Sequence, residues 1–187
     1  MIVIKDSRKK LVILDRDGVI NQDSKDFIKS EEEWIPIPGS IDAIASLSNS
    51  GFIVAIATNQ SGIARKLFGF RELEAMHRKL HGLVYEAGGH IEKIIVCPHG
   101  PDEESDCRKP NPKMLNMLIK EYQISHENVF AIGDSLRDLE AADKAGVTPL
   151  LVRTGNGLKT EKDLPLKFSK IQICNDLAEA AIDIIKA

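Results

Sequence analysis

The sequence predicts an α/β fold with a doubly wound, Rossmann-like parallel sheet. Two observations predict it: short runs of consecutive apolar residues, rich in Val, Ile and Leu, recur along the chain, and longer amphipathic segments separate them. Continuous apolar runs are typical of strands that connecting helices bury on both faces of a parallel sheet. The chain has 187 residues, so we expect a single domain over residues 1–187.

Strands are expected at the short apolar runs, beginning with LVIL at Leu11–Leu14. The expected strands are 11–14, 52–57, 93–96, 129–132, 149–152 and 171–173. Helices are expected where apolar residues recur at helical spacing. These segments are 40–49, 71–87, 112–122, 136–145 and about 176–185. Two stretches, 21–38 and 97–111, break the alternation, and loops of such length are often functional.

The composition excludes some classes of partner. The formal net charge is −3, so no global field attracts nucleic acid or an anionic membrane, and an anionic ligand needs local cations or a metal. No apolar run approaches the ~20 residues of a membrane span. The start, MIVIKDSRKK, has too short an apolar stretch for a signal peptide. The three cysteines do not indicate a disulfide framework, and the cytoplasm is the expected location.

Polar residues follow the expected strands. Asp15-Arg16-Asp17-Gly18 follows the first strand, Thr58-Asn59 follows the second, and Gly133-Asp134 follows the fourth, with Asp138 shortly after. Arg108-Lys109-Pro110 lies in the loop after the third strand. Because ligands of open α/β sheets bind beyond the carboxyl ends of the strands, we expect these side chains to share one crevice.

These residue types suit phosphoryl transfer. Asp15 and Asp134 offer hard oxygen ligands for Mg²⁺, whose charge lets an anionic phosphate approach. Asp15 can attack phosphorus and form an aspartyl phosphate, while Asp17 acts first as general acid and then as general base. Thr58 can donate a hydrogen bond to the transferring phosphoryl group, and Lys109 can neutralise its oxygens. The residues thus predict a magnesium-dependent phosphatase.

Other interpretations stay open at this point. Asp-x-Asp-Gly also occurs in calcium loops, although here the glycine comes too early for an EF-hand. Asp134 alone suits a helix N-cap. A receiver-like signalling module also forms an aspartyl phosphate, but its phosphorylated aspartate follows the third strand, where this chain has Val96-Cys97-Pro98. An interaction protein with a retired active site is a further alternative.

The motifs Asp15-x-Asp17-Gly18, Thr58-Asn59, Lys109-Pro110 and Gly133-Asp134-x-x-x-Asp138 resemble, in order, the four motifs of the haloacid dehalogenase (HAD) superfamily. Five segments are similar to those of the D-glycero-D-manno-heptose 1,7-bisphosphate 7-phosphatases and their histidinol-phosphatase relatives. They are 14–21, 58–65, 97–99, 107–110 and 151–155. The resemblance covers nearly the whole chain. It implies a HAD-like fold with no large cap domain, in which the short loops 21–34 and 97–109 lie over the site and choose the substrate.

The resemblance also implies residue roles. Asp15 is the implied nucleophile and Asp17 the implied general acid and base. Magnesium is bound by the Asp15 side chain, the Asp17 carbonyl and the Asp134 side chain. The resemblance implies that Arg108 binds the second phosphate or the sugar, and Asn59 is a further candidate substrate-binding residue. The implied pathway supplies heptose for bacterial surface lipopolysaccharide.

A zinc site in the loop after the third strand is a further implication, because the family often carries Cys-x-His and Cys-x-Cys there. Cys97, His99 and Cys107 are present, but Ser105 stands where the remaining cysteine is expected. Structural zinc normally has four tetrahedral ligands, and serine is a poor one. The candidates for the fourth ligand are water, Asp102 and Asp106. A metal-free loop with two free thiols is the alternative.

A bisphosphate needs cationic contacts beyond those at the reacting phosphate. Arg65, Arg108 and Lys109 can supply them, and arginine suits bidentate recognition of phosphate. This favours the heptose bisphosphate as the small-molecule substrate, leaves histidinol phosphate as the alternative, and leaves the anomer open. The absence of a long capping domain favours a monomer.

Overall fold

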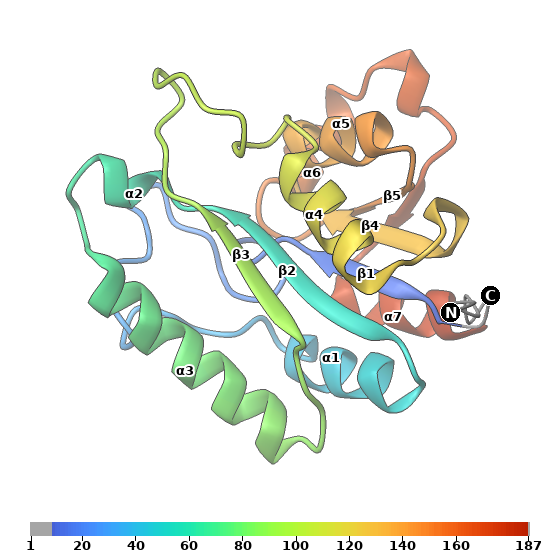
Figure 1. Cartoon of the computed structure of the whole chain (residues 1–187), viewed down its shortest axis with the longest axis horizontal. Coiled ribbons are helices and arrows are strands. Elements are labelled where there is room, and N and C mark those ends of the chain that lie inside the picture. Colours follow the sequence, from blue (N-terminus) through green and yellow to red (C-terminus); the bar gives the residue numbers. More distant parts are fainter. Residues whose placement is uncertain (1–8, 187) are drawn as a thin grey trace, which may run out of the picture.

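The computed structural model describes residues 9–186, which form one six-stranded sheet between layers of helices (Figure 1). Residues 1–8, most of the segment MIVIKDSRKK in which no signal peptide is expected, lie outside the described residues. The strands are β1 (Leu11–Leu14), β2 (Ile53–Asn59), β3 (Lys93–Cys97), β4 (Val129–Gly133), β5 (Thr148–Val152) and β6 (Gln172–Cys174). The α-helices are α1 (Ser40–Asn49), α2 (Ser61–Ala64), α3 (Phe70–Glu86), α4 (Lys113–Tyr122), α5 (Leu136–Ala145), α6 (Gly157–Lys162) and α7 (Leu177–Lys186). Two 3₁₀ turns are η1 (His126–Asn128) and η2 (Leu166–Phe168).

All strand pairs are parallel, in the order β3-β2-β1-β4-β5-β6. The chain runs outward from β1 to β3 and then returns to the other side of β1 with β4. The winding direction therefore reverses between β1 and β4, which pair in register from Leu11 opposite Val129 to Leu14 opposite Ile132. Such a reversal leaves a crevice at the carboxyl ends of the two strands, where ligands bind.

The sheet has a separate core on each face, because successive strand residues point to opposite sides. Val12 and Leu14 of β1 belong to the core that α1, α3 and α7 cover. Leu11 and Ile13 belong to the core beneath α4 and α5. Figure 1 shows these two helix layers on opposite sides of the sheet. All four residues are at most 2% exposed, which is why this strand is an unbroken apolar run.

The predicted elements are confirmed with small shifts of their ends. Helices α1 and α5 have the predicted bounds, and the other predicted helices and strands begin and end within two residues of their predicted positions. Helices α2 and α6 were not predicted. They have four and six residues, and only glycine is fully buried in each, so neither produces an apolar repeat that could reveal it.

The two segments that break the alternation, 21–38 and 97–111, contain no helix, and the only residue of the sheet in them is Cys97, which ends β3. The first is anchored by Trp34, which is fully buried. Lys79 Nζ of α3 donates to the carbonyl oxygens of Glu31 at 2.7 Å and Trp34 at 2.9 Å. These hydrogen bonds hold the segment against α3. Among residues 9–186, no helix combines the length and apolar character needed to span a bilayer.

Candidate active site

Three carboxylates converge at the crevice between β1 and β4. Asp15 follows β1, Asp134 follows β4, and Asp138 lies in the first turn of α5. Ligand oxygens of the three lie within 4.8 Å of one another, and all three side chains are buried. The strand ends thus bring Asp15 and Asp134 together as the sequence led us to expect. Clustered oxygen donors of this kind suit Mg²⁺.

The carboxylate cluster is electrostatically unfavourable without a metal ion, even with Lys109 beside it. Burial raises the pKa of Asp15 to about 6 against the lowering effect of Lys109, and the charges of Asp138 and Asp17 add to the rise. Burial and the charges of Asp138 and Asp15 raise the pKa of Asp134 to about 7. A divalent cation among these oxygens would favour the ionised forms. The residues present therefore fit magnesium.

The backbone approaches Asp134 closely because two glycines leave room for it. A Cβ on Gly18, whose φ is 83°, would lie 2.1 Å from Asp134 Oδ2, and one on Gly155 would lie 2.2 Å from the same atom. Asn156 donates to this oxygen from its backbone at 2.7 Å and from its side-chain amide at 3.1 Å. Asn156 was not singled out from the sequence, because only the fold brings the loop after β5 to this point.

Lys109 is a buried cation between two carboxylates. Its Nζ lies 3.0 Å from Asp15 Oδ1 and 2.6 Å from Asp138 Oδ1, and its side chain is 4% exposed. The Asn59 side-chain amide donates to the Lys109 carbonyl and accepts from the Lys109 amide, both at 3.1 Å. Asn59 ends β2, so this pair attaches the loop 97–109 to the sheet. Its amide thus positions Lys109.

Asp17 accepts hydrogen bonds from three side chains. Arg16 Nη2 donates to both carboxylate oxygens, at 2.9 and 3.0 Å, Asn21 Nδ2 donates at 2.9 Å and Gln60 Nε2 at 2.8 Å. Burial by itself raises the pKa of Asp17, but the charge of Arg16 and these hydrogen bonds hold it below its usual range. The carboxylate is kept in the form that accepts a proton. Sequence reasoning did not single out Arg16, Asn21 or Gln60 as its partners.

A pocket opens over these groups, and both irregular segments contribute to its wall. The lining residues are Asp15, Asp17, Asp23, Ser24, Phe27, Ile28, Thr58, Asn59, Gln60, Ser61, Arg108 and Arg137. The predicted residue Arg65 does not line it, but its guanidinium lies 5.6 Å from the centre of the Phe27 ring. Buried Thr58 accepts a hydrogen bond from Gln60 Nε2 at 3.0 Å. Burial and the charges of Arg137 and Arg65 lower the pKa of Arg108.

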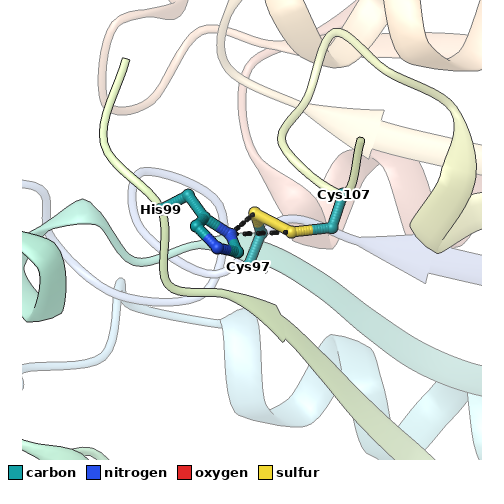
Figure 2. A group of neighbouring side chains, drawn as sticks. All are labelled: Cys97, His99 and Cys107. Carbon is teal, nitrogen blue, oxygen red and sulfur yellow. Dashed lines mark hydrogen bonds between the residues drawn. A yellow bond between two sulfur atoms is a disulfide. The ribbon is translucent and has the colours of Figure 1, made fainter. Parts of the chain in front are cut away.

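Cys97, His99 and Cys107 lie together in the loop after β3, with ligand atoms within 4.8 Å of one another (Figure 2). Cys97 and Cys107 are joined by a disulfide, which corrects the expectation that this loop, if metal-free, carries two free thiols. The sequence showed no such pairing, because residues 98–106 between the cysteines have no pattern that predicts the Cα–Cα separation of 5.6 Å. His99 Nδ1 lies 3.6 Å from Cys97 Sγ and 3.4 Å from Cys107 Sγ.

Ser105 occupies the fourth corner of this Cys/His cluster. Its Oγ lies 3.2 Å from both His99 Nδ1 and Cys107 Sγ, and 3.6 Å from Cys97 Sγ. Neither predicted acidic alternative, Asp102 or Asp106, belongs to the cluster. Asp106 forms an ion pair with Lys113 instead.

The fold and the site define the class of protein. A doubly wound sheet with an aspartate after β1, an Asp-Lys-Asp arrangement beside it and a further aspartate after β4 is that of a HAD-like phosphatase. The HAD-hydrolase-like family matches residues 106–180.

Comparisons with individual proteins are more specific. A D-glycero-β-D-manno-heptose-1,7-bisphosphate 7-phosphatase of Pseudomonas putida is 55% identical over 177 residues, 94% of this chain and 99% of the relative. Its counterpart in Pseudomonas aeruginosa is 50% identical, over 95% of this chain and 99% of the relative. The crystal structure of the D,D-heptose 1,7-bisphosphate phosphatase from Bordetella bronchiseptica, complexed with magnesium and phosphate, has a TM-score of 0.90 at 49% identity and covers 95% of this chain and 98% of that one. The chain belongs to the family of D-glycero-D-manno-heptose-1,7-bisphosphate 7-phosphatases.

Proposed function

We propose that the protein is a magnesium-dependent phosphatase that hydrolyses the 7-phosphate of D-glycero-β-D-manno-heptose 1,7-bisphosphate. The observation that carries the proposal is the buried cluster of Asp15, Asp134 and Asp138 with Lys109 between two of them. The substrate and its β anomer follow from the names of relatives at 55%, 50% and 49% identity.

Asp15 is the proposed nucleophile. Lys109 Nζ, 3.0 Å from Asp15 Oδ1, orients the carboxylate and supplies positive charge for the phosphoryl oxygens. Attack of an Asp15 oxygen on phosphorus breaks the bond to the sugar O7 and forms an aspartyl phosphate. Attack of water on the same phosphorus then breaks the Asp15–phosphorus bond and releases inorganic phosphate.

Asp17, which also lines the pocket, is the proposed proton-transfer group. In the second step it takes a proton from the attacking water, and its hydrogen bonds from Arg16, Asn21 and Gln60 favour the ionised form that this requires. In the first step it must give a proton to the leaving alkoxide. A phosphate dianion bound beside it raises the pKa of a carboxyl group, which favours uptake of that proton when substrate binds.

Magnesium, when bound, would offset the carboxylate charge and stabilise negative charge on the phosphoryl oxygens. We propose that the Asp15 and Asp134 side chains and the Asp17 carbonyl hold it. Asn156 supports this role, because its two hydrogen bonds to Asp134 Oδ2 orient that carboxylate. Thr58, at the end of β2 in the pocket wall, is the proposed hydroxyl donor to the transferring phosphoryl group.

The two loops over the site, 21–34 and 97–109, are the proposed determinants of substrate choice. Asp23, Ser24, Phe27 and Ile28 supply part of the pocket wall from the first loop, and Arg108 supplies part from the second. Arg108 Nη1 donates to the His99 carbonyl at 3.0 Å, which holds the guanidinium at the pocket. Histidinol phosphate, the alternative substrate, has no second phosphate for such a cation.

Phosphate release should separate the substrates and test the mechanism in one experiment. Wild type and Asp17→Asn are compared with both anomers of the heptose 1,7-bisphosphate and with histidinol phosphate, with and without Mg²⁺. We expect magnesium-dependent turnover of the β anomer by the wild type, and a loss of about 10²- to 10⁴-fold in the variant, the usual range for a general acid and base. Faster turnover of histidinol phosphate would contradict the substrate assignment. An Asp17→Asn variant of normal activity would contradict the mechanism.

We propose that Cys97, His99 and Cys107 bind a structural zinc ion when the cysteines are reduced. The same two sulfurs cannot form a disulfide and act as thiolate ligands at once, so the bound metal requires reducing conditions. Protein purified under such conditions should contain about one zinc per chain, measured by plasma mass spectrometry. Ser105→Cys, which adds a fourth thiolate at the corner that Ser105 occupies, should bind zinc more tightly. Zinc-free reduced wild-type protein would exclude the site.

The proposed biological role is to supply heptose for the synthesis of lipopolysaccharide. We propose that the enzyme acts in the cytoplasm as a monomer. Light scattering after size-exclusion chromatography would reveal any larger assembly.

A further inference from the structure

We propose that Arg137 is a substrate-binding residue that, together with Arg108, binds the phosphate that is not transferred. This inference rests on the proposed function and adds to it a residue that the motifs do not contain. It also states how the pocket selects a bisphosphate.

Arg137 is placed at the pocket by the first turn of α5. The next residue, Asp138, is buried in the carboxylate cluster, whereas Arg137 is exposed and lines the pocket with Asp15, Asp17 and Arg108. The charges of Asp138, Asp15 and Asp134 act on Arg137 and, although burial opposes them, raise its pKa. Its guanidinium therefore belongs to the electrostatic environment of the site.

Among the described residues, no hydrogen bond or ion pair engages the guanidinium of Arg137, whereas other cations at the site have partners. Arg16 is bound to Asp17 and Gln60. Lys109 is bound to Asp15 and Asp138. The donors of Arg137 thus remain available for a ligand in the pocket.

Arg137 and Arg108 also form a like-charge pair. The charge of Arg137 contributes to the lowered pKa of Arg108, so the two guanidinium groups repel each other across the pocket. A phosphate dianion between them would relieve this repulsion, and arginine binds phosphate through two parallel hydrogen bonds. A ligand with an ammonium group, such as histidinol phosphate, would meet the same two cations and be repelled. The pair therefore favours a second phosphate over an amine.

The transferred phosphate is expected elsewhere, beside Asp15. The cation next to that carboxylate is Lys109, which is 4% exposed and therefore more buried than Arg108 and Arg137. Arg108 is half-buried and Arg137 exposed, so both belong to the rim. The buried lysine and the two more exposed arginines can thus bind the two phosphates of one bisphosphate separately.

Steady-state kinetics of Arg137→Met with two substrates tests the inference. The substrates are the β-heptose 1,7-bisphosphate and the corresponding heptose 7-phosphate, which lacks the second phosphate. The matched control is Arg78→Met, because Arg78 is an exposed arginine of α3 whose one ion-pair partner within residues 9–186 is Glu74. We expect Arg137→Met to raise KM for the bisphosphate roughly 10- to 100-fold, with kcat changed less than about 3-fold. Turnover of the monophosphate should be nearly unchanged, and Arg137→Lys should restore part of the affinity.

The outcomes separate the inference from the proposed function. Equal losses on both substrates would place Arg137 at the transferred phosphate or in the fold, and no loss would remove it from the site; either overturns the inference while the proposed function stands. If wild type turns over neither substrate, the proposed function fails and the inference fails with it. Arg108→Met and the double variant complete a double-mutant cycle. If the fold-increases in KM of the two single variants multiply to give that of the double variant, the two arginines do not share a phosphate.

Discussion

Asp15→Asn is expected to lower kcat by at least about 10⁴-fold, because it removes the nucleophile without changing the size of the side chain. No aspartyl phosphate should form in rapid-quench experiments with the variant. Asp42→Asn is the matched control, because Asp42 is exposed in the first turn of α1 and should leave kcat unchanged. Normal turnover in Asp15→Asn would contradict the mechanism, and a lost activity in the control would show that the assay reports general damage.

The same variant should be more stable than the wild type in EDTA at pH 8. The folded pKa values of Asp15 and Asp134, about 6 and about 7, lie above the unfolded value of about 4. The folded state therefore binds more protons than the unfolded state in this range, and stability falls as pH rises. Asparagine at position 15 removes one of the charges. A rise of about 2 pKa units corresponds to up to about 3 kcal/mol, or several degrees in Tm.

Thermal unfolding between pH 5.5 and 8 measures this effect. In EDTA the Tm of the wild type should fall as pH rises, and the fall should be smaller in Asp15→Asn. Magnesium should remove most of the slope in the wild type, because it binds the ionised carboxylates of the folded protein. A wild-type Tm that does not depend on pH or magnesium would contradict the raised pKa values of the carboxylate cluster and its proposed binding of magnesium.

Lys109→Met is expected to lower both activity and stability strongly. Removing the cation leaves Asp15 and Asp138 buried without their partner, which costs about 3–5 kcal/mol in comparable buried pairs. The substitution also removes the positive charge that stabilises the phosphoryl oxygens, so kcat should fall about 10³-fold. Urea unfolding and phosphate release, both in Mg²⁺, measure the two effects. Lys113→Met is the control, because its ion pair with Asp106 is exposed and should contribute less than about 1 kcal/mol.

A double variant separates the two effects of Lys109. Lys109→Met with Asp138→Asn removes one of the carboxylates left unpaired, so it should recover part of the lost stability. Its activity should stay low, because the cation beside Asp15 is still missing. Recovery of activity along with stability would show that Lys109 acts only by supporting the fold.

Local patterns were enough to predict most of the fold. The run LVIL at 11–14 is apolar at every position because helices cover both faces of β1. Such a run predicts a buried parallel strand. The bounds of α5 follow from its apolar spacing and from Gly146 at its end. Helix α6 has no such spacing, so its position depends on the packing of the loop after β5.

The arrangement of the site likewise depends partly on local sequence and partly on the tertiary structure. The sequence alone determined that Asp15 and Asp134 meet, because both follow parallel strands and such strands end at the same edge of a sheet. Only the tertiary structure decided that Asn156 holds Asp134, that Lys109 is buried between two carboxylates, and that Arg137 faces the pocket. These groups are brought together by the winding of the sheet and by side-chain packing between segments far apart in the chain. No local pattern of residues in the sequence predicts such contacts.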